Sequence, residues 1–221
     1  MFERILNEWK EEMSIVAQTK WFERMARGDI KLCHYKGYLR ETYHHAGLNP
    51  QIQAFATMYF QNNPRSMINL FYGHARQEIC HDLLALSDLE KLGENTEPVK
   101  NSKPLPSTLA FNAFAIYLIQ FVNPVSYLGY LFHLEYLPTQ NGKQYIEMLL
   151  AAGVPANALT FLEEHSTVDI AHNEMMKKYI TNLIKNEKDL NDVIYAVRAS
   201  CILHGKMISD ALEFGEKNYS A

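Results

Sequence analysis

GVPANALTFLEEHSTVDIAHNEMMKKYI, residues 153–180, predicts one long helix that begins at Pro155. A proline is favoured in the first helical turn because its missing N–H would have no partner there. Within this helix His165, Asp169 and His172 are spaced i, i+4 and i+7, which places them on one face. Two imidazoles and a carboxylate on one face favour a metal ion such as Fe, Mn or Zn, with open positions left for other ligands.

The segment HARQEICH, residues 74–81, repeats this spacing, with Glu78 between His74 and His81. Apolar residues keep a helical period over about residues 64–92, so we expect one continuous helix that carries all three side chains. The chain has only nine histidines, and two such stripes among so few are hard to attribute to chance. The sequence therefore predicts a metal site built from at least two helices.

The rest of the chain also follows helical patterns. We expect a helix to open at Pro124 and end near Pro138, a shorter helix over 141–152, and a last helix capped by Asp189. Residues 94–107 are polar, contain three prolines and show no periodicity, so they should form a surface excursion. Three helix starts share an asparagine cap followed by proline: Asn49-Pro50, Asn63-Pro64 and Asn123-Pro124.

No segment alternates apolar and polar residues between hairpin turns, so strands are not expected. At 221 residues the chain is long enough for one large domain and short for two. The sequence predicts an all-α, single-domain bundle of seven to nine helices that spans residues 1–221.

Composition excludes several classes of protein. A hydrophobic fraction of 48% and a charged fraction of 21% are those of a globular domain. A net charge of -4 gives no basic surplus for nucleic acid or an anionic membrane, and no apolar stretch is long enough to span a bilayer. The three cysteines form no CxxC pair, which argues against disulfides and favours a reducing cytoplasm. The oligomeric state stays open, a homodimer included.

Glu135 is the strongest candidate outside the two stripes. Its helical neighbours are Leu128, Leu131 and Phe132, so it projects from an apolar face. An unpaired carboxylate there would destabilise the fold by roughly several kcal/mol, the usual cost of burying a charged group, or would stay protonated and neutral. A metal cation would compensate it; a buried salt bridge to Arg or Lys, or a side chain that reaches solvent, is the alternative.

The candidate ligands are therefore three carboxylates and three imidazoles on three helices. Carboxylates can bridge two iron ions while neutral imidazoles fill terminal positions, so two ions explain this set better than one. His74 is expected to lie outside the ligand shell or to face substrate, and Asp82 to orient a ligand or be solvated. Tyr43, His44 and His45 are pocket candidates, with Leu131 and Phe132 as apolar walls. The ligand candidates are Glu78, His81, Glu135, His165, Asp169 and His172.

Several of these segments resemble the haem-oxygenase-like di-iron oxidases and oxygenases, which are iron-containing redox enzymes related to the TenA and PqqC proteins. The resemblance covers nearly the whole chain, and HSTVDIAH is its most specific part. The matching segments are WFERMARGDI (21–30), YLRETYHHAG (38–47), EICHDLLALSDLEKLG (78–93), PVSYLGYLFHLEYLP (124–138) and residues 153–180.

The resemblance implies a seven-helix bundle in which the six candidate ligands bind two irons. It implies dioxygen as co-substrate, an external electron donor, and a small carboxylic or amino acid-like substrate that is cleaved, N-hydroxylated or desaturated. It also leaves alternatives: a metal-free TenA/PqqC-like protein that acts as a cofactor-independent oxidase or a binding scaffold, or a ferritin-like di-iron protein. A haem oxygenase would use His34 as axial ligand, which would leave the buried acids unexplained.

Overall fold

The computed structural model describes residues 1–60 and 65–219, and it describes the side chains of all of these except residues 167–172. Every regular element of the described chain is a helix, which confirms the predicted all-α class. The α-helices are α1 (Phe2–Val16), α2 (Lys20–Ala26), α3 (Leu32–Ala46), α4 (Asn49–Thr57), α5 (Arg65–Gln77), α6 (His81–Lys91), α7 (Glu97–Lys100), α8 (Pro106–Tyr117), α9 (Tyr127–Ala151), α10 (Thr160–Leu183) and α11 (Glu187–Asn218). A short π-helix, η1 (Leu118–Val122), and two 3-10 helices, η2 (Pro124–Ser126) and η3 (Ala156–Ala158), connect some of them.

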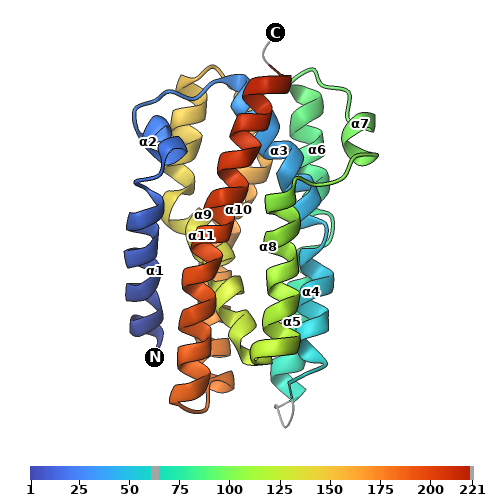
Figure 1. The fold of residues 1–221 in the computed structure, drawn as a ribbon. Coiled ribbons are helices and arrows are strands. Elements are labelled where there is room, and N and C mark those ends of the chain that lie inside the picture. The colour runs from blue at the N-terminus through green and yellow to red at the C-terminus, as the bar shows by residue number, and fades with distance from the viewer. Residues whose placement is uncertain (61–64, 220–221) are drawn as a thin grey trace.

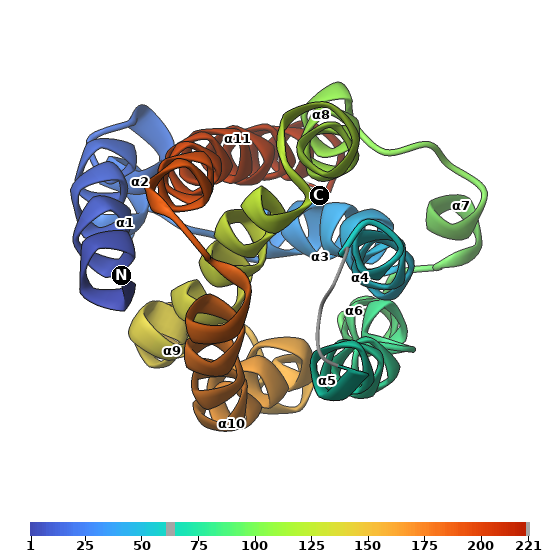
Figure 2. The same cartoon turned by 90° about the horizontal axis from the view of Figure 1, so that it is seen from below.

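Most of the long helices run roughly along one axis of the molecule (Figure 1). Helix α11 packs along four other helices, which are α3, α9, α1 and α8. Seen from below, α9 and α10 lie side by side, and α4, α5 and α6 group together on another side (Figure 2). The apolar stripes of these amphipathic helices meet in one continuous core.

Glycines permit close contacts between helices, and two of them lie on helices that pack against α11. A Cβ added to Gly37 on α3 would lie 2.1 Å from the backbone oxygen of Ala211 on α11. A Cβ added to Gly129 on α9 would lie 2.3 Å from the backbone oxygen of Val193, also on α11. Since no side chain fits at these distances, glycine at both positions allows α3 and α9 to pack directly against α11.

The predicted continuous helix over 64–92 is wrong. The structure divides it into α5 and α6, with a turn at residues 78–80 in which Cys80 adopts the left-handed conformation at φ 75. The predicted end near Pro138 is also wrong, because α9 continues through this proline to Ala151. The division into α5 and α6 adds one helix to the predicted set in the described chain, whereas the fusion of two predicted helices into α9 removes one.

Helix caps agree in part with the sequence. Asn123 accepts a hydrogen bond from the Val125 N–H, as predicted for the Asn-Pro start of η2. The last helix is capped by Asn186, which accepts from the Asp189 N–H, so Asp189 itself lies inside α11. The Asn63-Pro64 start lies outside the described residues. The predicted excursion 94–107 includes α7, which stands away from the bundle axis in Figure 1.

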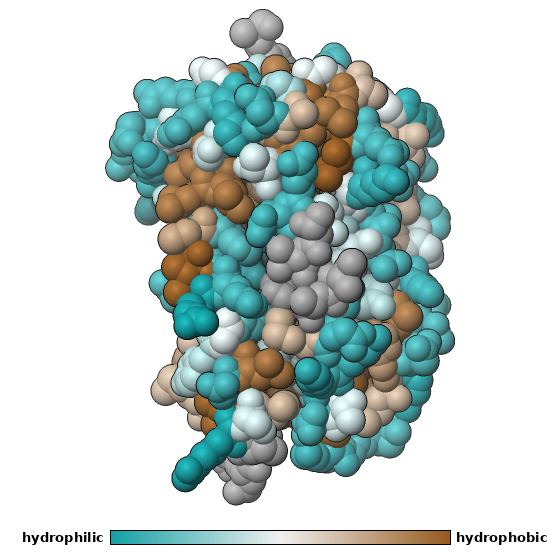
Figure 3. Space-filling view, turned by 180° about the vertical axis from the view of Figure 1, so that it is seen from behind, coloured by the Kyte–Doolittle hydropathy of each residue, from teal (hydrophilic) through white to brown (hydrophobic). Residues whose placement is uncertain are grey.

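Among the described residues, no helix is long and apolar enough to cross a bilayer. The face opposite to Figure 1 mixes hydrophilic and hydrophobic side chains, with no continuous apolar belt (Figure 3). Single apolar residues scattered over a surface in this way are common in folded proteins.

Candidate metal centre

The turn between α5 and α6 brings Glu78 and His81 to the interior of the bundle. Glu78 is 8% exposed, and its Oε2 lies 3.1 Å from His81 Nδ1. Glu135 comes from the middle of α9 and is 6% exposed. Burial of two carboxylates is costly unless cations or hydrogen-bond donors compensate them, so their partners define the site.

The partners of these carboxylates are histidines. His74 Nε2 lies 3.1 Å from Glu135 Oε1 and 3.8 Å from Glu78 Oε1. The potential ligand atoms form two groups, and within each group all of them lie within 4.8 Å of one another. The groups are Glu78 with His81 and His165, and Glu78 with His74 and Glu135. Glu78 belongs to both groups: its Oε1 faces His74, and its Oε2 faces His81.

These spacings fit ligands of a metal ion. Donor atoms bound to one ion at about 2.1 Å lie about 3.0 Å apart at right angles and about 4.2 Å apart when opposite. The Glu78–His81 contact at 3.1 Å and the two His74–carboxylate contacts at 3.1 and 3.8 Å all lie in this range. Carboxylate and imidazole donors are those that iron and zinc accept in proteins.

Helix α10 delivers His165, and a buried acid fixes its start. Asp88 on α6 is fully buried and accepts hydrogen bonds from the Phe161 N–H at 2.9 Å and the Thr160 hydroxyl at 2.6 Å. An acceptor at this position satisfies N–H groups that the first helical turn leaves unpaired. A Cβ added to Gly142 on α9 would lie 3.0 Å from the Ser166 Cβ, so α9 and α10 approach closely beside His165.

The backbone of α10 also sets the tautomer of His165. Its Nδ1 lies 2.7 Å from the Phe161 carbonyl oxygen, which can only accept, so Nδ1 carries the proton. Burial lowers the pKa of His165, although Glu78 opposes this effect. The neutral ring therefore keeps its lone pair on Nε2, and its ring centroid lies 4.8 Å from that of His81. A backbone carbonyl on the outer nitrogen is the usual arrangement for a metal-binding histidine.

Gln53 on α4 performs the corresponding role for His74. Its side-chain amide nitrogen lies 3.0 Å from His74 Nδ1, and its Oε1 is buried without a hydrogen-bond partner among the described residues. A half-turn of the amide would bring this oxygen to Nδ1, which would then donate and leave the lone pair on Nε2. Gln53 can thus hold His74 either as a donor to Glu135 or as a ligand.

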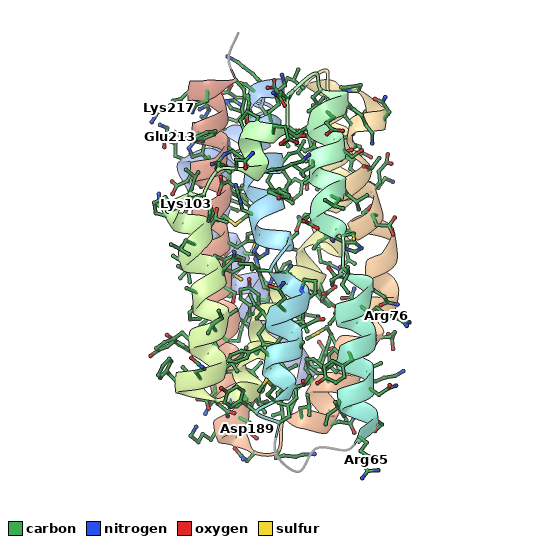
Figure 4. All side chains as sticks on the ribbon, turned by 90° about the vertical axis from the view of Figure 1, so that its right-hand side faces the viewer. Arg65, Arg76, Lys103, Asp189, Glu213 and Lys217 are labelled. Atoms are coloured by element: carbon green, nitrogen blue, oxygen red, sulfur yellow. The ribbon has the colours of Figure 1, made fainter. Side chains whose placement is uncertain are left out.

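A cavity of about 130 Å³ adjoins the centre. Glu78, Glu135 and His165 line one part of it, and most of the other lining residues are aliphatic or aromatic. None of the described residues that line it is a lysine or an arginine. Basic residues such as Arg65, Arg76, Lys103 and Lys217 lie instead at the periphery of the bundle (Figure 4).

The structure brings four of the six predicted ligands together: Glu78, His81, Glu135 and His165. The side chains of Asp169 and His172 lie outside those described. His74, predicted to lie outside the ligand shell, faces both carboxylates directly.

The predicted pocket residues divide into two groups. Leu131 lines the cavity, whereas Phe132 does not and stacks on Tyr136 instead. His44 contacts Ser102 at 3.0 Å, and Tyr43 lies beside it, away from the cavity. Asp82 lies against Gly47, also outside the lining.

Some site residues carry no recognisable sequence signal. Gln53 follows no motif, and the left-handed Cys80 is neither glycine nor asparagine. Of the adjacent pocket candidates His44 and His45, only His45 lines the cavity, and the rotation of α3 decides between them. None of the three cysteines lines the cavity, and burial raises the pKa of the Cys201 thiol to about 12, which disfavours a thiolate nucleophile.

Comparison with known proteins identifies the family and the fold. A family profile described as iron-containing redox enzyme matches residues 36–205. No curated protein sequence matches the chain.

Solved structures show the fold. A domain of unknown function with a heme oxygenase-like fold from Shewanella denitrificans is 26% identical, with a TM-score of 0.82 over 99% of this chain and 93% of that one. A TenA homolog from Pseudomonas syringae pv. tomato is 13% identical, with a TM-score of 0.74 over 96% and 92% of the two chains. A TenA homologue from P. horikoshii is 11% identical, with a TM-score of 0.75 over 96% and 98%. The chain thus has a haem oxygenase-like fold.

Proposed function

The chain belongs to the family of iron-containing redox enzymes, and from that premise we propose that it is a non-haem di-iron oxidoreductase that uses dioxygen. The observation that carries this proposal is the shared position of Glu78. One of its oxygens faces His81, the other faces His74, and each side belongs to a separate group of ligand atoms. A carboxylate with two such sides is suited to bridge two ions.

In this proposal Glu78 is the bridge, and the remaining residues divide between the ions. His81 and His165 would hold one ion; His74 and Glu135 would hold the other. Asp169 and His172 remain predictions from the helical spacing of residues 165–172. Because the protein ligands are distributed over two ions, each ion keeps open positions for dioxygen or substrate.

Bound iron would supply the electrons for reduction of dioxygen, with an external donor to restore them. The chain's own residues set the conditions for that chemistry. The Phe161 carbonyl keeps the His165 proton on Nδ1, and the Gln53 amide orients His74, so both rings are held for binding. The apolar wall around Leu131 and Leu134 keeps bulk water from the centre.

The cavity supports a small organic substrate that reaches the metal directly. Its described lining has no lysine or arginine, so the carboxylate of a small carboxylic or amino acid-like substrate would find its cation at the metal end. Apolar contacts from residues such as Leu131 and Met148 would hold the rest of the molecule.

Iron content after anaerobic reconstitution with Fe(II) tests the proposal. We expect about two irons per chain in the wild type, about one in Glu135→Gln and fewer than one in Glu78→Gln, because only Glu78 serves both ions. Glu174→Gln, at an exposed glutamate paired with Lys177 on α10, is the matched control and should keep about two.

The same samples separate the proposal from its rivals. Dioxygen uptake on exposure to air should follow iron content across the variants. A wild type that binds no iron would indicate a metal-free scaffold or a cofactor-independent oxidase. Binding of a single iron, reduced equally by both substitutions, would contradict the di-iron site.

A further inference from the structure

A row of ring nitrogens crosses the bundle from α1 to the cavity, on the side of α9 that faces α11. Trp9 Nε1 lies 3.1 Å from His133 Nδ1, and His133 Nε2 lies 2.8 Å from His204 Nδ1. These rings belong to neither group of candidate metal ligands.

The indole fixes the direction of this row. An indole N–H can only donate, so His133 Nδ1 accepts, and the single proton of the neutral His133 ring is on Nε2. That N–H donates to His204 Nδ1, which leaves the proton of neutral His204 on its Nε2. Cys201 Sγ, 3.4 Å from His133 Nδ1, is placed to donate its weak S–H to the same lone pair. Burial lowers the pKa of His133 to about 3 and that of His204 well below its ordinary value, so both rings are neutral near pH 7.

His45 on α3 carries its proton on the other ring nitrogen, Nδ1, in contrast to His133 and His204. Asn112 Nδ2 donates to the His44 carbonyl at 3.5 Å, which turns Asn112 Oδ1 toward His45 Nδ1 at 2.6 Å. His45 Nδ1 must therefore carry the proton, and Nε2 keeps a lone pair. This Nε2 is buried and has no hydrogen-bond partner among the described residues. Burial lowers the pKa of His45 to about 4, so the ring stays neutral.

The two rings meet at the cavity wall. His45 and His204 both line the cavity, and their centroids lie 6.0 Å apart. Phe111 fixes both ring planes, with its centroid 5.0 Å from that of His45 and 4.9 Å from that of His204, on which it stacks. No hydrogen bond to a described residue engages His204 Nε2, so the wall offers one acceptor, on His45, and one donor, on His204.

We propose that His45 and His204 form a polar subsite of the cavity that binds a hydroxyl group of a small ligand. A hydroxyl donates one hydrogen bond and accepts another, so it satisfies the His45 lone pair and the His204 N–H together. Its two hydrogen bonds of about 2.8 Å meet at the oxygen at roughly the tetrahedral angle, so they join nitrogens about 4.6 Å apart. Two rings whose centroids lie 6.0 Å apart can present nitrogens at such a separation. An anionic group at this subsite would be repelled by the His45 lone pair and would find no lysine or arginine among the described residues of the wall.

The size of the cavity limits the ligand. Its volume of about 130 Å³ is close to that of an engineered cavity of about 150 Å³ that binds benzene. A ligand with one six-membered ring and one hydroxyl therefore fits. None of the hydrogen bonds of the subsite involves a candidate metal ligand. The subsite therefore depends on the proposed function in one respect only, which is that its ligand is the substrate.

Phenol and toluene test the subsite in metal-free protein, which separates the result from any failure of iron binding. The two molecules have nearly the same shape, and only phenol has a hydroxyl. Calorimetric titration of the wild type should show phenol binding about tenfold more tightly than toluene, as expected for a buried hydrogen-bonded group. Equal affinities, tighter toluene binding, or binding of neither molecule would overturn the proposal.

Variants locate the effect. His45→Phe keeps a ring of similar shape and removes the acceptor, so phenol should lose its tenfold advantage while toluene binding is kept. Met148→Leu changes the cavity wall without touching either histidine and should alter the affinities of both probes alike. A phenol preference that persists in His45→Phe would also contradict the assignment.

The tautomers provide a second readout that requires no variant. Nitrogen-15 chemical shifts of the imidazole rings in metal-free protein should show the proton of His45 on Nδ1 and those of His133 and His204 on Nε2. Trp9→Phe removes the donor that fixes the row and should allow His133 and His204 to exchange tautomers. A proton on His45 Nε2 or on His204 Nδ1 in the wild type would refute the donor and acceptor roles.

Discussion

Glu78 Oε2 and His81 Nδ1 lie 3.1 Å apart across the turn that separates α5 from α6. Cys80, between them in sequence, is at φ 75, the only positive φ of a non-glycine residue in the described chain. A left-handed residue other than glycine costs about 1–2 kcal/mol. The turn that presents two candidate ligands is therefore held against a local backbone preference, as is common at functional sites.

Cys80→Gly should relieve this strain. Glycine adopts the left-handed conformation without steric cost, so we expect a gain of up to about 1 kcal/mol in the free energy of unfolding, with iron content unchanged. Cys80→Val, which places a β-branched residue at the same φ, should lose stability by a comparable or larger amount. Urea unfolding of the metal-free proteins measures both changes. A destabilised glycine variant would show that the Cys80 side chain itself supports the turn.

Gly37→Ala should weaken the contact between α3 and α11. The added methyl group would lie 2.1 Å from the Ala211 backbone oxygen, so the helices must separate. We expect a loss of about 1–3 kcal/mol, the usual cost of overpacking a core. Gly73→Ala on α5 is the control, since no atom lies within 4 Å of the added Cβ and alanine favours the helix by up to about 1 kcal/mol. Equal effects at the two glycines would contradict the close contact.

Asp88→Asn should disturb the start of α10. The carboxylate accepts from the Phe161 N–H and the Thr160 hydroxyl and also contacts Lys91 at 3.1 Å, and an amide can replace only part of these bonds. We expect a loss of about 1–2 kcal/mol, as for other helix caps, and weaker iron binding because His165 follows in the next turn. Thermal unfolding and iron titration check the two effects. Unchanged iron affinity would show that α10 is positioned without this cap.

Stability of the metal-free protein should fall as the pH is lowered from about 6.5 toward 4. Burial lowers the pKa of His45 to about 4 and that of His204 well below its ordinary value. Of the charged neighbours of His45, His165 lowers its pKa further, and Glu78 raises it. The unfolded chain, with ordinary pKa values near 6.5, binds more protons in this window, so acid favours unfolding by about 1.4 kcal/mol per pH unit for each histidine. His45→Phe should reduce this slope in urea unfolding from pH 7 to pH 5. An unchanged slope would mean that His45 accepts a proton in the fold.

The sequence predicted the helical class and most of the charged centre because both depend on local spacing. Helical periodicity places Glu135 on a buried face, and the structure finds it there at 6% exposure. The spacing of His74, Glu78 and His81 suggested one stripe, and the three do converge, although through a turn rather than a continuous helix.

The remaining features depend on tertiary contacts. The division at Cys80 has no sequence signal, since the rest of the fold imposes its conformation. Pro138 remains inside α9 because long flanking stretches of helix pack against α10 and α11, which outweighs one lost hydrogen bond. The row from Trp9 to His204 joins residues far apart in sequence, and helical periodicity cannot reveal such a contact.

Paramagnetic resonance of the Mn(II)-loaded protein tests the central claim that Glu78 joins two metal ions. Two ions that share one carboxylate are close enough to couple magnetically, so the fully loaded wild type should give a coupled spectrum with many lines. Glu135→Gln should give the simple six-line spectrum of one isolated Mn(II). A six-line spectrum from the fully loaded wild type, unchanged by Glu135→Gln, would contradict the shared site.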